Sequence, residues 1–190
     1  MRDEFELTPL ANRNPLTNHF DEMRIVEVVD RSFTMIEARK NCLSICREAI
    51  SQNLGIELPG ISKSSKSGDL AIRWMRPNAW MFEAPYSVLN PLETRLKNFL
   101  GDNGSIVEHS DAWCVFDLIG NSCITVLERL CNVDTNNMVS GDICSTRLEH
   151  LNCFIICQKE QTEFRIMGPR SAAGSVHNSI ITATASVNEF

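Results

Sequence analysis

The chain has 190 residues, of which 43% are apolar and 22% are charged, and its formal net charge is −6. These values are ordinary for a soluble globular protein, and the length allows one or two small domains. The acidic balance, without a cluster of Lys and Arg, argues against nucleic-acid binding, and no apolar run approaches the roughly 18 residues of a membrane span. The charged start lacks the apolar segment of a secretory signal, so we expect a cytoplasmic protein.

The first third of the chain predicts an arm, a strand and a helix. Residues 1–20 contain two prolines and little periodicity, which is typical of an extended arm. Residues 23–29 predict a strand. Residues 41–54 predict a helix because their apolar positions recur with the helical period, and Gly55 is a suitable C-terminal stop. Residues 60–68, with four Ser and two Lys, predict an exposed loop.

A hairpin and a second helix follow. The pattern predicts strands at 70–75 and 79–84, joined by a turn around Pro77. Asn90 and Pro91 are then suited to cap and open a helix that continues to Leu100.

The second half of the chain predicts a similar order. We expect strands at 105–109 and 112–118, a helix at 121–131, strands at 144–149, 152–158 and 162–167, and a final helix after Pro169. This last helix is rich in Ala, Ser and Thr and is too weak to be stable alone.

An internal repeat relates the two halves. Ile25-Val26-Glu27 with Asp30 recurs as Ile106-Val107-Glu108 with Asp111, an offset of 81 residues (25 to 106) that also carries Cys42 onto Cys123. Two copies indicate two similar halves in one body, not a solenoid. We therefore expect an arm at 1–20 and halves at 21–104 and 105–190, forming one compact domain. Short links between strands require antiparallel pairing, so the fold class is α+β, with two pseudo-repeated split βαβ halves.

The eight cysteines lie mostly inside apolar segments, where free Cys behaves as a small hydrophobe. Cys42 and Cys46, and likewise Cys153 and Cys157, share one face of their elements, so a metal site is geometrically conceivable. Structural zinc, however, takes four ligands, commonly from polar turns. We therefore favour reduced core thiols over a metal site or a redox adaptor.

The sequence supplies no clear catalytic signature. His19, His109, His150 and His177 are scattered without metal-binding spacing. No nucleophile elbow, no Gly-rich dinucleotide motif and no P-loop is present. We accordingly assign no catalytic, cofactor-binding or metal-binding residue.

Five segments, in this order, resemble the gamma subunit of heterotetrameric sarcosine oxidase, a relative of the folate-binding aminomethyltransferases (glycine cleavage T-protein). The resemblance covers nearly the whole chain. Its segments are Thr8-Pro9-Leu10-Ala11, Arg73 to Met81, Cys131-Asn132-Val133-Asp134, Ile143 to Leu148 and Phe164 to Ser171. The chain departs from the family pattern at Asn132, where Pro is usual, and after Ala172, where a Trp-Leu pair is missing.

The resemblance implies a non-catalytic subunit of a complex that oxidatively demethylates sarcosine to glycine. Tetrahydrofolate would accept the one-carbon unit, and oxygen would be reduced to hydrogen peroxide. FAD, FMN, NAD, tetrahydrofolate and zinc would belong to the other subunits. The alpha, beta and delta subunits would be the partners, with alpha in direct contact, and dimethylglycine or another N-methyl amine remains an alternative substrate.

Large aromatic and Arg side chains are the candidates for the interface. Trp74, Trp80 and Trp113 lie in predicted strands and could anchor a partner or fill the core. Arg147 and Arg170 lie in matched segments, where a guanidinium could hold a carboxylate or carbonyl across a subunit boundary. An intrachain salt bridge is the alternative for both.

A rival from another class is a stand-alone folate-binding one-carbon protein of the aminomethyltransferase superfamily. It predicts the same fold, so the fold cannot separate the two hypotheses. Its acid for the folate chemistry would be Asp111 or Asp134.

Overall fold

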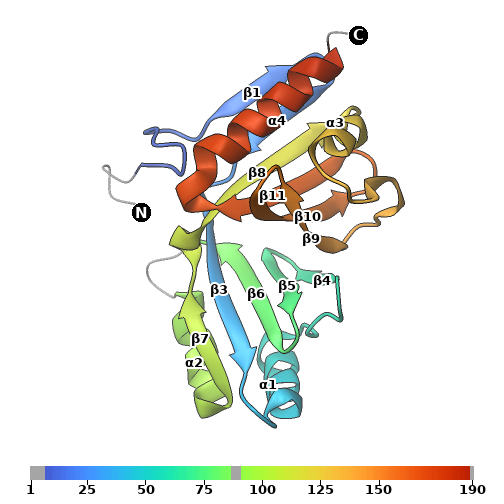
Figure 1. Ribbon diagram of the computed structural model, residues 1–190. Coiled ribbons are helices and arrows are strands. Elements are labelled where there is room, and N and C mark those ends of the chain that lie inside the picture. The colour runs from blue at the N-terminus through green and yellow to red at the C-terminus, as the bar shows by residue number, and fades with distance from the viewer. Residues whose placement is uncertain (1–6, 87–90, 189–190) are drawn as a thin grey trace. The chain divides into compact units, whose positions relative to one another are not determined.

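The computed structural model describes residues 7–86 and 91–188 and contains two units (Figure 1). The first unit runs from Asp30 to Ser110. The second combines the described residues up to Val29 with those from Asp111 onward. The described part of the chain therefore starts in the second unit, passes into the first and returns.

The first unit has one five-stranded sheet, in the order β4-β5-β6-β3-β7, and all its neighbouring strands pair antiparallel. Helices α1 and α2 pack on one face of this sheet, where they share a core with β3, β5 and β6. The elements in chain order are β3 (Arg31–Ala38), α1 (Leu43–Leu54), β4 (Ser64–Ser67), β5 (Leu70–Arg76), β6 (Ala79–Pro85), α2 (Leu92–Leu100) and β7 (Gly104–Glu108).

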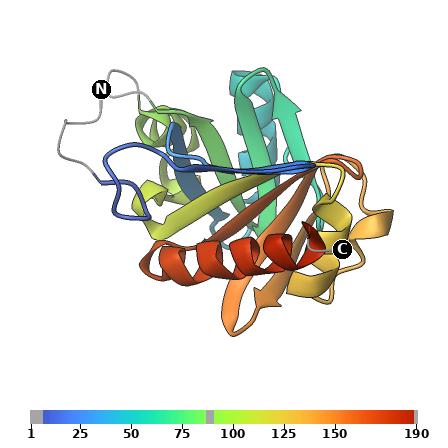
Figure 2. The same ribbon diagram turned by 90° about the horizontal axis from the view of Figure 1, so that it is seen from above.

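The second unit has a six-stranded antiparallel sheet in the order β1-β2-β8-β11-β10-β9. Helices α3 and α4 pack on one face, and Figure 2 shows α4 lying across the strands. The elements are β1 (Thr17–Phe20), β2 (Met23–Glu27), β8 (Trp113–Gly120), α3 (Cys123–Leu130), β9 (Ile143–Leu148), β10 (Leu151–Lys159), β11 (Glu163–Pro169) and α4 (Ala173–Asn188).

The first unit contains two split βαβ motifs, and the second contains one, β8-α3-β10, beside β11, α4 and the separate strand β2, so the predicted α+β class is confirmed. In the first unit, β3 and β5 are both antiparallel to β6, which lies between them, and α1 lies between β3 and β5 in the chain. Strand β7 is likewise separated from β6 by β3 in the sheet and follows α2. This is the ferredoxin-like strand order with one added edge strand. The second unit has the same central order, with β2, β8, β10 and β11 in place of β7, β3, β5 and β6, and one added strand at each edge, β1 and β9.

The internal repeat reflects the fourth strand of the ferredoxin-like order, which pairs with β3 in the first unit and with β8 in the second. In the first unit it is β7, which follows α2 directly, but in the second unit it is β2, near the start of the chain. The repeated segments are therefore β2 with β3, and β7 with β8. The predicted halves, 21–104 and 105–190, differ from the units because β2 pairs with β8 and β7 pairs with β3.

The predicted helices of the first unit form around regularly spaced apolar residues. Gly55 ends α1 with a φ of 64°, a conformation that glycine adopts readily. In α2, the side chains of Leu92, Leu96 and Leu100 are buried at helical spacing. The predicted cap at Asn90 lies outside the described residues.

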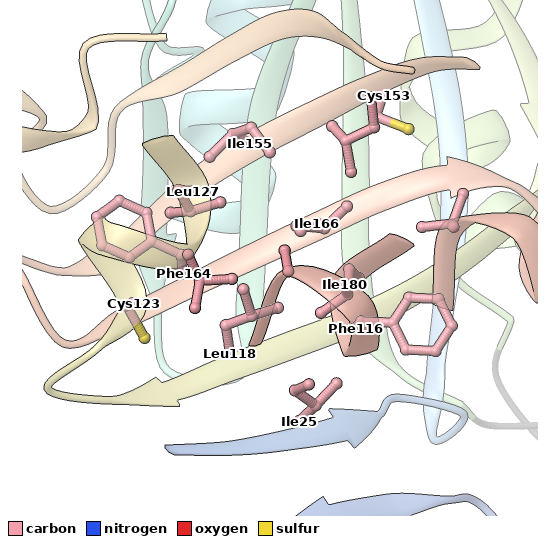
Figure 3. Packing of buried hydrophobic residues seen from close by; sticks show 14 of the residues in the cluster. Ile25, Phe116, Leu118, Cys123, Leu127, Cys153, Ile155, Phe164, Ile166 and Ile180 are labelled. Atoms are coloured by element: carbon pink, nitrogen blue, oxygen red, sulfur yellow. The ribbon is translucent and has the colours of Figure 1, made fainter. Parts of the chain in front are cut away.

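Three segments differ from the sequence-based expectation. The last four residues of the predicted arm form β1, and part of the predicted loop at 60–68 forms β4. Both are edge strands, which need no alternating apolar pattern. Helix α4 extends over 16 residues because Val176 and Ile180 pack into the core shown in Figure 3. Over the described residues, no helix is both long and apolar enough to cross a membrane.

Replacing Gly120 with Ala should severely destabilise the second unit. Gly120 ends β8 with a φ of 146°, and an added Cβ would lie 2.0 Å from the Glu22 carbonyl oxygen. The backbone of β2 would have to move away, so we expect the free energy of unfolding to fall by roughly 3 kcal/mol or more.

Urea unfolding followed by circular dichroism measures this change. Gly174→Ala is the matched control, because a Cβ there meets nothing within 4 Å in helix α4. The control should be neutral or should stabilise by up to about 1 kcal/mol. A Gly120→Ala protein as stable as the wild type would contradict the close approach of β2 and β8.

Candidate functional site

Trp74 and Trp80, two of the predicted interface residues, lie side by side in the first unit as a cross-strand pair of β5 and β6. Trp80 is only 2% exposed, and its indole Nε1 donates to the Pro59 carbonyl oxygen at 2.9 Å. Trp74 is half-buried. Trp80 is therefore mainly a core residue whose polar atom is satisfied, whereas Trp74 is partly open to solvent.

Both tryptophans line a hollow of about 240 Å³, which we call the aromatic groove. In Figure 1, α1 and the turn between β5 and β6 lie at the same end of the first unit, and both contribute to the groove. Most of its wall is apolar. The lining residues are Leu43, Arg47, Pro59, Gly60, Ile61, Trp74, Pro77, Asn78 and Trp80.

Among the described residues that line the aromatic groove, Arg47 is the only charged one. Its guanidinium carbon lies 5.7 Å from the centre of the Trp80 ring, within the range of a cation–π contact. One of its nitrogens donates to the Leu58 carbonyl oxygen over a long 3.4 Å. The groove therefore combines apolar walls with a cation, which suits an apolar group beside an anion. The sequence analysis missed Arg47, although it lies one helical turn after Leu43 on the same face of α1.

Trp113, Arg147 and Arg170 lie in the second unit, so the structure does not place them in the aromatic groove. The Trp113 ring stacks edge-on against Phe154, with centroids 5.9 Å apart, and its buried Nε1 has no hydrogen-bond partner among the described residues. Arg147 is exposed on the edge strand β9, and its side chain makes no hydrogen bond or ion pair within the described part of the chain. Arg170 donates to the Leu7 carbonyl oxygen at 2.9 Å. The role of these three residues in an interface stays a prediction.

Buried charges are held in ion pairs within each sheet. Arg165 contacts both carboxylate oxygens of Asp117, at 2.7 and 2.8 Å, across strands β11 and β8. In the first unit, Glu83 accepts from Arg31 at 3.0 Å and lies 2.7 Å from Arg73. Such pairs satisfy buried charges and need no catalytic explanation.

Glu27 is a buried carboxylate that the sequence analysis did not single out. It is 2% exposed, and its two oxygens accept the backbone N–H groups of Leu10 and Leu16, each at 3.0 Å. The carboxylate therefore fastens the N-terminal arm to the second unit. Its repeat counterpart, Glu108, is exposed and accepts only the local N–H of Ser110, at 2.8 Å.

All eight cysteines are free, and five of them are buried. Burial raises the pKa of Cys114 and Cys123 to about 12 each, and that of Cys153 and Cys157 to about 11 each. A thiol with such a pKa is protonated at neutral pH and is a poor nucleophile or metal ligand. Figure 3 shows Cys123 and Cys153 among the apolar side chains of this core.

The remaining titratable candidates do not converge on one place. Asp111 is 85% exposed and lies 3.8 Å from Arg170, and Asp134 accepts from the side chain of Asn137 at 2.7 Å. His177 is half-buried, with its Nε2 2.8 Å from the Asn18 side-chain oxygen. Among the described residues, no group of three or more His, Cys, Asp or Glu is placed to hold a metal ion.

The fold defines a class of α+β proteins built from two ferredoxin-like units. The sequence profile of the Sarcosine oxidase, gamma subunit family matches residues 42–185. The chain therefore belongs to this family, and the predicted resemblance is confirmed. No protein with a curated description matches the chain in sequence.

Solved structures support the same fold. A chain of heterotetrameric sarcosine oxidase from Corynebacterium sp. U-96, determined in complex with pyrrole 2-carboxylate, is 19% identical, with a TM-score of 0.78. The match covers 87% of this chain and 85% of that one. Glycine cleavage system aminomethyltransferase T from Bartonella henselae is 14% identical, with a TM-score of 0.61. That match covers 82% of this chain but 44% of the aminomethyltransferase, so this chain spans less than half of its length.

Thiol labelling should separate the buried from the half-buried cysteines. In the native protein, a disulfide-exchange reagent near pH 8 should react readily with the half-buried Cys42 and Cys144, and more slowly with Cys131, because burial raises the pKa of its thiol. In denaturant without reductant, all eight should react. Absorbance of the released thiolate measures both counts, and fewer than eight in denaturant would indicate a disulfide and favour a redox role.

The stability of the second unit should depend on the protonation of His177. Burial lowers the pKa of His177, and the carboxylate of Glu27 opposes that shift. The unfolded chain then binds the proton more readily, so the free energy of unfolding should fall as the pH drops below the ordinary His pKa of about 6.5.

Urea unfolding at about pH 7.5 and about pH 5.5 tests this dependence. His177→Gln should lose less stability on acidification than the wild type. His150→Gln, which changes an exposed histidine, should behave as the wild type does. An equal acid-induced loss in His177→Gln and the wild type would contradict the role of His177.

Proposed function

We propose that this chain is the non-catalytic gamma subunit of a heterotetrameric sarcosine oxidase and supports assembly and stability of that complex. The family match over residues 42–185 carries the proposal. The aromatic groove and the exposed guanidinium of Arg147 support it, because both offer binding surface without an assembled catalytic group. The chain would act in the cytoplasm.

The chemistry of the complex would lie on the other subunits. Sarcosine would be demethylated oxidatively to glycine, with tetrahydrofolate as the one-carbon acceptor and oxygen reduced to hydrogen peroxide. FAD, FMN, NAD, tetrahydrofolate and zinc would be bound by the alpha, beta and delta subunits, and alpha would contact this chain directly. The present chain would contribute a binding surface for the other subunits and would stabilise the assembled complex.

Co-expression of this chain with the alpha, beta and delta subunits tests the proposal. Native mass spectrometry should show one assembly of four different chains, with flavin absorbance. Omitting this chain should lower the yield and the melting temperature of the remaining complex, because a ligand or partner that binds only the native state stabilises it. An identical yield and melting temperature without this chain would argue against the proposed role.

Direct titration with tetrahydrofolate distinguishes the gamma-subunit proposal from the rival hypothesis. A stand-alone folate-binding one-carbon protein should bind tetrahydrofolate saturably as an isolated chain. The gamma-subunit proposal predicts no saturable binding in the micromolar range, and calorimetry or the intrinsic fluorescence of the three tryptophans would record either result.

A further inference from the structure

We infer that the aromatic groove of the first unit anchors a segment of a partner subunit, by an apolar side chain with an adjacent carboxylate held by Arg47. The inference rests on the proposed function, which supplies the partner. It goes beyond it by naming the surface and the chemistry of the segment that binds there.

The charge of the groove points to an acidic group in the occupant. Arg47 has no carboxylate partner among the described residues; its contacts there are the Trp80 ring and the Leu58 carbonyl oxygen. Arg47 also lines a second depression together with two acidic residues, Glu48 and Glu57. Their carboxylates instead accept hydrogen bonds from Gln52 at 3.0 Å and from Ser51 at 2.6 Å. The guanidinium is therefore available for an external anion.

The apolar walls of the groove point to an apolar side chain beside that carboxylate. Ile61 is 75% exposed, and Trp74 is half-buried at the same hollow. A partly exposed aromatic ring beside an Arg is the composition that binding hot spots favour. Because Trp80 is fixed by its hydrogen bond to Pro59, the floor of the groove is already ordered before anything binds. A preordered site loses less conformational entropy on association.

The size of the groove favours a side-chain anchor over a folate molecule. Its volume of about 240 Å³ lies below the range of about 300–1,000 Å³ that is usual for pockets that enclose a small molecule. One or two side chains of a docked segment fit this volume. The groove is therefore better suited to a docked side chain than to an enclosed folate molecule.

Two substitutions in the groove test the inference in the co-expressed complex: one reverses the charge of Arg47, and the other places a charge at the apolar Ile61. Arg47→Glu and Ile61→Asp should each weaken binding of this chain to the other three subunits by about tenfold or more, a loss of about 1.4 kcal/mol. Arg95→Glu, on the exposed surface of α2, and Val139→Asp, at a residue 50% exposed outside the groove, are the matched controls. Both should bind as the wild type does, and circular dichroism should show that all four variants are folded.

Zero-length cross-linking identifies the occupant. In the Arg47→Lys variant, carbodiimide should couple the new amine to an Asp or Glu of a partner subunit, whereas Arg95→Lys should give no such product. Mass spectrometry locates the joined residues. A cross-link to a second copy of this chain, or to no carboxylate at all, would overturn the inference.

The outcomes distinguish failure of the proposed gamma-subunit role from failure of the groove as the anchor. If the wild-type chain does not assemble with the other subunits, the proposed function fails. If the wild type assembles and the groove variants bind equally well, the gamma-subunit role stands and the groove is not its anchor. Saturable tetrahydrofolate binding that Arg47→Glu abolishes would assign the groove to the rival function.

Discussion

The pairing of β2 with β8 is the constraint on which the second unit depends. Five residue pairs join these strands, and Gly120 lets the β2 backbone approach closely. Without this pairing, β1 would lose its partner strand and Ile25 would leave the core. The first unit, inserted between β2 and β8 in the chain, completes its own sheet with β7. Strand β2 must therefore pair with β8, which follows the whole first unit in the chain, and this raises the contact order of the second unit.

The same constraint gives two identical tripeptides different tasks. In β2, Glu27 is buried and both its carboxylate oxygens bind backbone N–H groups of the arm. In β7, an edge strand, Glu108 stays exposed and contacts only its own turn. The repeat is therefore architectural: it preserves how a strand completes a sheet, while its polar residues respond to what covers each sheet edge. The repeated pair Cys42 and Cys123 behaves similarly, half-buried in one unit and fully buried in the other.

Much of the fold followed from the sequence because helical and strand periods report burial directly. The helical period of residues 41–54 predicted α1, and the strands around Pro77 formed where expected. The strand order did not follow, because a repeat of β2 and β7 does not say which sheet each strand joins. Helix α4 was predicted as weak from composition, yet tertiary burial of its apolar face sustains it. The aromatic groove was partly foreseen through Trp74 and Trp80, whereas Arg47 looked like any polar residue on an amphipathic helix.

Most of the buried core of the first unit lies outside the groove, and this makes a binding role physically simple. Residues such as Ile50, Phe82 and Leu96 hold the first unit together without lining the groove. Trp80 links the two most directly, because its ring belongs to the core while its face carries the Arg47 contact. Leu43 and Trp74 also line the groove and pack against this core. Substitutions at Arg47 or Ile61 can therefore change what binds while leaving the folded state intact, whereas Trp80 cannot be changed without disturbing both. A ferredoxin-like unit of this kind can present a partner-specific surface on an unaltered core, which is what a subunit without its own chemistry requires.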